Sequence, residues 1–136
     1  MILKKNIKIS ISPGELVDKI TILEIKASSI KDSVKIPAVV RELTTLLKVY
    51  SGVVKHHSTK KSQLNKLKLQ LSSVNKKLWK IEDKIRKHEA RKNFNTAFIE
   101  LSRSVYRNND IRSELKNKIN ILMGSDIKEI KEYTIY

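Results

Sequence analysis

A hydrophobic seam with a seven-residue repeat runs through the middle of this 136-residue chain. Its positions are separated alternately by four and three residues, which is the spacing of helices that wind around one another. The phase is kept over fifteen positions: Val39, Leu43, Leu46, Tyr50, Val53, His57, Lys60, Leu64, Leu67, Leu71, Val74, Leu78, Ile81, Ile85 and His88. We therefore expect a long helix that packs against a partner helix.

The seam predicts one continuous helix over residues 37–91. Pro37 suits the first turn of a helix, where its missing N–H costs nothing. A hairpin would have no reason to keep the register through its own loop, so we favour a single helix. Gly52 and the polar residues 56–61 are the weakest points of the seam. A helix broken between Gly52 and Lys61 is the alternative.

Two further helices flank the seam. Ser12, Pro13 and Glu15 form a helix start with an N-cap, a proline at the first position and a capping-box carboxylate. The helix that follows, 13–30, is apolar around most of its circumference, which predicts a buried helix whose charges are paired or reach a cavity. Another helix is expected over 96–123, with Asn95 as its N-cap and Gly124 at its end.

Both ends of the chain are predicted to form short strands. Ile7, Ile9 and Ile11 alternate with polar residues in a strand over 2–11, and β-forming residues dominate a strand over 128–136. We expect these strands to pair as a short β-hairpin. The expected fold is mainly α: a single domain over 1–136 with a long coiled-coil-like helix, two or more further helices and this hairpin.

Several classes of protein are excluded by composition. The chain has no cysteine, so it forms neither a disulfide framework nor a thiolate metal site. Its three histidines are not spaced as a ligand set, and we expect neither a metal nor a cofactor. No apolar run is long enough to span a membrane, and the N-terminus lacks the apolar core of a signal peptide. We therefore expect a cytoplasmic protein without a membrane span.

The formal net charge of +15 has two readings. Cations are concentrated over residues 55–92, where only Glu82, Asp83 and Glu89 oppose them, and such a face attracts polyanions such as nucleic acid. Lysine, isoleucine and asparagine are also the residues that AT-rich codons favour. The charge is then a consequence of composition, and the sequence leaves both readings open.

Two groups of polar residues are candidates for a site. One helix face beside the seam carries Asn75, Trp79, Glu82, Arg86 and Glu89, with Asp83 next to them. This face either packs against another helix or contacts a ligand.

The second group surrounds Arg112, which occupies a seam position of the 96–123 helix as Asn108 does. A buried arginine needs a carboxylate, and Glu24, Glu82 and Asp83 are the expected partners. Such a polar layer sets register between helices, or it forms an anion pocket. The pocket would take Arg86, Lys19 and Lys116 as further cations and Tyr106 as a hydrogen-bond donor. The candidate ligand-binding residues are Lys19, Glu24, Trp79, Glu82, Asp83, Arg86, Tyr106, Asn109, Asp110, Arg112 and Lys116.

Three stretches resemble a family of small proteins of bacteria and their phages, a DUF6165-like domain of unknown function. They are SPGELVDKITILEIK (12–26), NKKLWKIEDKIR (75–86) and 98–118 with YRNND at its centre. The resemblance implies a cytoplasmic, helical, single-domain protein and no particular reaction. The lysine content is higher than the resemblance leads us to expect, so polyanion binding is not implied as a family property. The implied recurring polar positions are Glu15, Asp18, Lys19, Thr21, Glu24, Lys26, Asn75, Trp79, Glu82, Asp83, Arg86, Tyr106, Asn109, Asp110 and Arg112.

Three functions are compatible with these features. The first is a homo-oligomeric binding or scaffold protein, a dimer before other states, whose polar inter-helix layer binds a small anion. The second is a metal-independent enzyme in which Lys19, Arg86 and Arg112 hold a small anionic substrate while Glu82 or Glu24 acts as acid or base. The third is a nucleic-acid-binding protein that uses the 55–92 face. Whether the chain is an enzyme is left open by the sequence.

Overall fold

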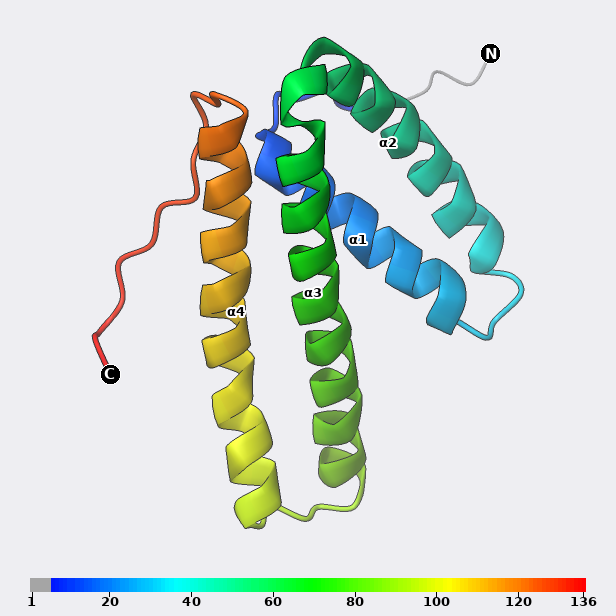
Figure 1. Cartoon of the computed structure of the whole chain (residues 1–136). Helices are drawn as coiled ribbons and strands as arrows, with labels where there is room; N and C mark the ends of the chain where they lie inside the picture. The colour runs from blue at the N-terminus through cyan, green and yellow to red at the C-terminus, as the bar shows by residue number, and fades with distance from the viewer. Residues whose placement is uncertain (1–5) are drawn as a thin grey trace.

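The computed structural model describes residues 6–136, which form four α-helices and no β-strand. The helices are α1 (Pro13–Ser29), α2 (Ile36–His56), α3 (Lys61–Ala90) and α4 (Thr96–Leu122), and a short 3-10 turn, η1 (Ser58–Lys60), joins α2 to α3. α3 and α4 form a long antiparallel pair; α1 crosses one half of this pair, and α2 lies against α1 (Figure 1). The other half of the α3–α4 pair projects beyond α1 as a two-helix arm (Figure 1).

The helix ends follow from local sequence. The Ser12 hydroxyl accepts a hydrogen bond from the Glu15 amide at 3.1 Å, and Pro13 occupies the first turn of α1. The Asn95 side chain caps α4 by accepting from the Phe98 amide at 3.1 Å. Gly124 follows α4 with a φ of 68°, in the left-handed region that glycine adopts without strain.

The core lies where α1, α3 and α4 meet. The buried apolar cluster there consists of Val17, Leu64, Leu71, Leu115, Ile119 and Met123. Three half-buried residues of α2 pack against this cluster: Tyr50, Val53 and Val54. α1 is buried along most of its length, as expected for a helix that is apolar nearly all round. No residue of α2 is fully buried, so this helix is the outermost of the four.

The single helix predicted over 37–91 is wrong, because the chain turns back at residues 57–60. His57 leaves the helical conformation, with φ −125° and ψ 43°. The ammonium of Lys60, the next seam position, donates to the carbonyl oxygen of Leu122 at 2.7 Å, where the last carbonyls of α4 lack helical partners. The polar seam positions therefore mark a turn. The phase survives because both arms of the hairpin present the seam to the same core.

The predicted β-hairpin is also wrong. Residues 2–5 of the expected first strand lie outside the described residues, while 6–12 and 123–136 form no strand. Ile7 is 89% exposed and Ile135 is 96% exposed, so alternation of apolar residues is not matched by burial on one face. The tail after α4 runs back along the outer side of that helix, away from residues 6–12 (Figure 1). The Asn117 side chain holds it there through both hydrogen-bonding groups of the Glu129 backbone, at 2.9 and 2.8 Å.

The glycine of the helix start has a packing role. The Gly14 amide donates to Asn120 Oδ1 at 2.7 Å, which brings the first turn of α1 against α4. A Cβ at position 14 would lie 2.4 Å from the carbonyl oxygen of Lys116 and 2.7 Å from Asn120 Oδ1. Only a residue without a side chain allows this approach.

We predict opposite effects for two glycine-to-alanine substitutions. Gly14→Ala should lower the free energy of unfolding by about 1–3 kcal/mol or more, because backbone must move to accept the methyl group. Gly52→Ala is the matched control: nothing lies within 4 Å of its added Cβ, and alanine in a helix should stabilise by about 0.5–1 kcal/mol. Urea denaturation measures both changes. Equal effects of the two substitutions would contradict the close-packing role of Gly14.

Candidate functional site

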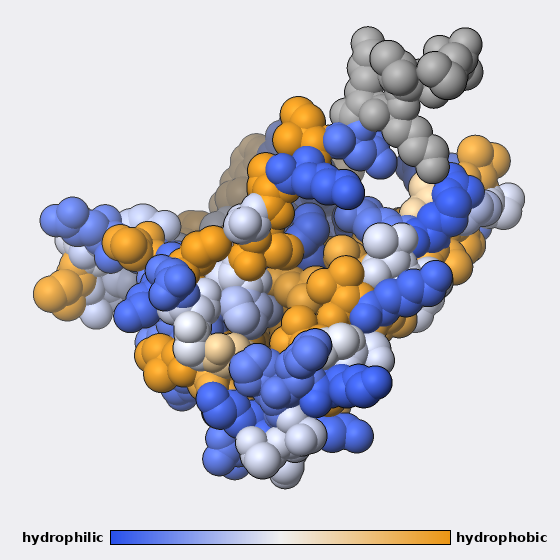
Figure 2. Space-filling model, turned by 90° about the horizontal axis from the view of Figure 1, so that it is seen from above, coloured by the Kyte–Doolittle hydropathy of each residue, from blue (hydrophilic) through white to orange (hydrophobic). Residues whose placement is uncertain are grey.

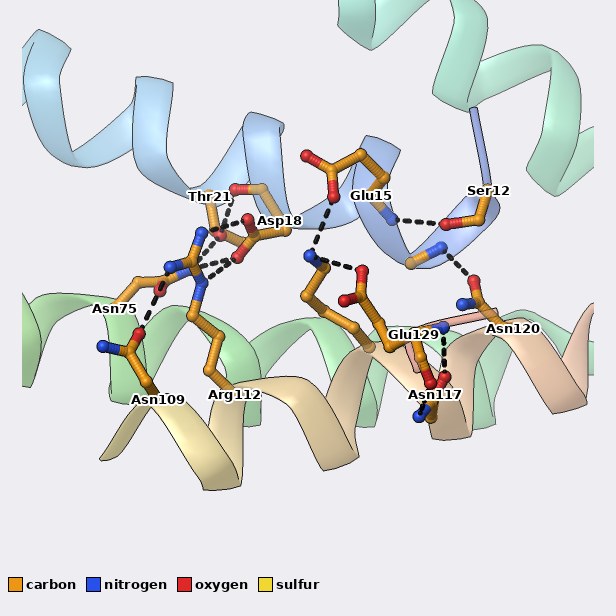
Figure 3. Close-up of polar contacts among 12 residues, drawn as sticks. Ser12, Glu15, Asp18, Thr21, Asn75, Asn109, Arg112, Asn117, Asn120 and Glu129 are labelled. Atoms are coloured by element: carbon orange, nitrogen blue, oxygen red, sulfur yellow. Dashed lines mark hydrogen bonds and ion pairs between the residues drawn. The ribbon is translucent and has the colours of Figure 1, made fainter. Parts of the chain in front are cut away.

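A buried carboxylate, Asp18 of α1, is the centre of the polar layer between the helices. Its side chain is 1% exposed. It accepts hydrogen bonds from Arg112 Nε at 2.9 Å and Nη2 at 2.5 Å, and from Asn75 Nδ2 at 2.9 Å (Figure 3). The same Asn75 amide group lies 2.9 Å from the Thr21 hydroxyl, which itself donates to the Asp18 carbonyl oxygen. One carboxylate thus joins α1, α3 and α4.

Arg112 is held by this pairing. Its two hydrogen bonds to Asp18 form a fork, the strongest geometry for a guanidinium and a carboxylate. The hydrogen bonds to Asp18 raise the pKa of Arg112 above its ordinary value, against the lowering effect of burial. A third contact runs from Nη1 to Asn109 Oδ1 at 3.4 Å. The positive charge of Arg112 is therefore compensated within the chain.

A second ionic group lies one helical turn further along α4. Lys116 is held between Glu15 of α1, at 2.8 Å, and Glu129 of the tail, at 2.6 Å (Figure 3). Burial lowers the pKa of the Lys116 ammonium, but hydrogen bonds to Glu129 and Glu15 outweigh this and raise it above its ordinary value. The Glu15 carboxylate, expected to complete a capping box with Ser12, is instead paired across the helix interface.

A pocket of about 480 Å³ opens between α1, α3 and α4 beside the Asp18–Arg112 pair. We call it the tryptophan pocket. Its apolar part is formed by Ile22, Ile25 and Leu78, and its polar part by Asn75, Trp79, Glu82, Asp83, Arg86 and Arg112. The pocket gathers the polar face of the seam helix that the spacing of four and three residues predicts.

A second pocket, of about 540 Å³, lies between α4 and the tail on the other side of Arg112. We call it the tail pocket. Among its lining residues, the Tyr136 hydroxyl donates to Asp110 Oδ2 at 2.5 Å, and Tyr106 meets Tyr136 edge to face. Its polar lining residues are Tyr106, Asn109, Asp110, Arg112, Ser113, Lys116, Glu129, Lys131, Tyr133, Thr134 and Tyr136.

The candidate residues from the sequence therefore fall into two pockets that share Arg112. Trp79, Glu82, Asp83 and Arg86 line the tryptophan pocket, whereas Tyr106, Asn109, Asp110 and Lys116 line the tail pocket. Lys19 is exposed and lines neither. Glu24 lines neither pocket and pairs with Lys68 at 3.2 Å.

The partner of Arg112 is not one of the carboxylates that the sequence suggested. Glu24, Glu82 and Asp83 were expected, and Asp18 is found. The available signal was the position of Asp18 inside a helix predicted to be buried all round, where an unpaired carboxylate is too costly to persist. Glu129 was also missed, because it lies in a segment predicted as a strand.

Within residues 6–136, histidine and carboxylate side chains form no group of three that is arranged to hold a metal ion. No helix in the same range has both the length and the apolar character needed to cross a bilayer.

We predict that Asp18→Asn lowers the free energy of unfolding by about 3–5 kcal/mol, because it leaves the half-buried Arg112 without its counter-charge. Glu24→Gln, which removes a more exposed ion pair with Lys68, should cost less than about 1 kcal/mol. Urea denaturation measures both variants. A cycle with Arg112→Met should show that the two substitutions are far from additive. A cost for Asp18→Asn no larger than that for Glu24→Gln would contradict the central role of this pair.

Of the comparisons with known proteins, the one with family models gives a match. The chain shows no detectable similarity to curated proteins or to solved structures. A family match covers residues 7–136, and so includes all four helices, both pockets and the tail. On this match, the chain belongs to the Family of unknown function (DUF6165).

Proposed function

We propose that this protein is a binding module whose tryptophan pocket takes a small organic ligand with an anionic group. The observation that carries the proposal is the presence of Arg86 and Glu82 in one partly apolar pocket without an ion-pair partner. Among residues 6–136, neither side chain takes part in a salt bridge or side-chain hydrogen bond, whereas Asp83 is paired with Lys87 at 2.9 Å. Charged side chains that line a pocket and have no counter-charge within the chain are candidates for ligand contacts.

The chemistry of the lining narrows the ligand. Arg86 supplies a planar fork of donors, which suits a carboxylate or a phosphate. Glu82 accepts a hydrogen bond and so favours a ligand that also carries a donor. Ile22, Ile25 and Leu78 supply an apolar surface, and Trp79, 38% exposed, offers an aromatic edge or face at the opening. A compact molecule with an apolar body, an acidic group and a donor matches this set.

Arg112 and Lys116 are weaker candidates for the anion than the sequence suggested. Arg112 already faces Asp18, and Lys116 already faces Glu15 and Glu129. Lys19 does not line the pocket, so the three cations required by an enzyme on an anionic substrate do not share one site. These positions favour binding over turnover, with Arg86 as the main recognition group.

We predict that small carboxylates or phosphate esters change the fluorescence of Trp79, the only tryptophan of the chain. Arg86→Gln should weaken that binding by about 10- to 100-fold, because hydrogen bonds to a charged group contribute roughly 1.5–3 kcal/mol each. Arg41→Gln is the matched control, since Arg41 is exposed on α2 and lines none of the pockets described. An unchanged affinity in Arg86→Gln would contradict the assignment of the anion to this pocket.

We also propose that α2 contacts a second copy of the chain. Its apolar face is wider than α1 covers: seam residues such as Leu43, Leu46 and Tyr50 are only half-buried, and Val40 and Leu47 beside them are exposed. Val40 and Leu47 are seven residues apart, so they repeat along the helix with the period of a coiled coil. The apolar face of α2 is complementary to α2 of another copy, because that helix has the same period and the same apolar face.

We predict that the protein in solution is larger than its 15.7 kDa chain and that Leu47→Glu lowers its mass to that of a monomer. A carboxylate within the apolar contact between copies would be desolvated without a partner. Lys48→Glu, at an exposed neighbouring position, should leave the assembly intact. Light scattering coupled to size exclusion measures the mass. A wild-type mass of one chain would contradict self-association.

A further inference from the structure

We propose that the two-helix arm binds single-stranded nucleic acid. The arm consists of the C-terminal half of α3, the N-terminal half of α4 and the loop between them. This surface is separate from the tryptophan pocket. It consists of a row of cations on the solvent side of α3, a groove at the end of the arm and an aromatic group in the loop between the helices.

The cation row lies on the side of α3 opposite the core. Lys76, Lys80, Lys84, Lys87 and Arg91 are spaced by four, four, three and four residues, so they form one stripe, and all five are exposed. At about 1.5 Å per residue the row is roughly 22 Å long. Among residues 6–136, only Lys87 of these five has an ion-pair partner, Asp83. Within the described residues, four of the five charges in the row are therefore uncompensated.

The row leads into a groove of about 620 Å³ between the ends of α3 and α4. Lys84, Lys87, His88 and Arg91 line it from α3, and Ala97, Glu100, Leu101 and Ser104 line it from α4. Its one carboxylate, Glu100, is paired with Arg103 at 2.8 Å. The groove is thus a positively charged recess at the end of a positively charged row, where an extended polyanion gains contacts on two sides.

An aromatic cluster is joined to this groove through His88, which lines it. Phe94, in the loop between α3 and α4, is 50% exposed and packs edge-on against Phe98 with ring centroids 5.1 Å apart. The ring of His88 also lies near Phe98, with centroids 6.0 Å apart. A held but open phenyl ring next to a cationic groove is the arrangement with which proteins stack an unpaired base. The sequence did not reveal it, because Phe94 and His88 belong to different predicted elements.

The position of the cation row on α3 favours a linear polyanion over a membrane surface as its partner. The apolar side of α3 is buried in the core, so the row does not border an apolar face that enters a bilayer. The arm projects away from α1 and α2, which leaves the row and the loop accessible together (Figure 1). Seen from above, the end of the molecule opposite the arm shows hydrophobic side chains in the middle with hydrophilic side chains around them (Figure 2).

The test is binding of a labelled single-stranded oligonucleotide of mixed sequence, measured by anisotropy at several salt concentrations. A variant with Lys76, Lys80, Lys84 and Arg91 changed to glutamine is compared with one in which Lys31, Lys35, Arg41 and Lys48, all exposed around α2, are changed in the same way. The two variants have the same net charge. In the arm variant, the slope of log K against log salt should fall by about 2.8, at about 0.7 per lost phosphate contact, and the control variant should keep its slope.

Phe94→Ala tests the base contact separately. It should weaken single-strand binding by about 5- to 100-fold and leave binding to a duplex of the same charge unchanged, because paired bases are not available to stack. Equal losses in the arm and control variants would overturn the proposal and show that binding follows net charge alone. Tighter binding to vesicles of anionic lipid than to the oligonucleotide would overturn it in favour of a membrane. Arg86→Gln should not alter oligonucleotide binding, so this proposal and the tryptophan pocket succeed or fail independently.

Discussion

The pairing of Asp18 with Arg112 is the interaction on which the arrangement of the helices depends. Removing a carboxylate from water is costly, and the cost is offset only by good geometry and additional hydrogen bonds. Asp18 has both: a two-pronged contact with Arg112 and a third hydrogen bond from Asn75. Because the three groups come from α4, α3 and α1, the contact that stabilises the carboxylate also sets how these helices are rotated toward one another.

The same pairing decides which charges are available to a ligand. Once Asp18 has compensated Arg112, and Glu15 with Glu129 has compensated Lys116, the inter-helix layer is closed to an anion. Among residues 6–136, α3 carries charged groups without an ion-pair partner on two of its sides. Glu82 and Arg86 face the tryptophan pocket, and the cation row from Lys76 to Arg91 faces solvent. A single helix therefore carries two separate candidate surfaces, one suited to a small molecule and one to a polymer.

The hydrophobic seam was identified correctly, but the single helix predicted from it over residues 37–91 was wrong. Its period identifies residues that face a helix partner, and both halves do so, with Tyr50 and Val53 on one arm and Leu64 and Leu71 on the other packed in one core. A seven-residue period does not show whether the chain continues straight or turns back. A straight helix and a helical hairpin joined by one 3-10 turn can therefore have the same spacing of apolar residues. The polar residues 56–61, which the sequence marks as the weakest points of the seam, contain the turn, and Lys60 bonds with the end of α4.

The sequence by itself determined the helices at residues 13–29 and 96–122, their caps at Ser12 and Asn95, and the shared face of Trp79, Glu82 and Arg86. Each depends on neighbours within about four residues, which local spacing describes well. Only the tertiary structure decided that Arg112 meets Asp18, that Gly14 contacts α4, and that His88 of the cationic groove meets Phe98. These features depend on the crossing and rotation of separate helices. The crossing angles and rotations of the helices are set by how their whole faces pack together, and the residue spacing within one segment does not reveal them.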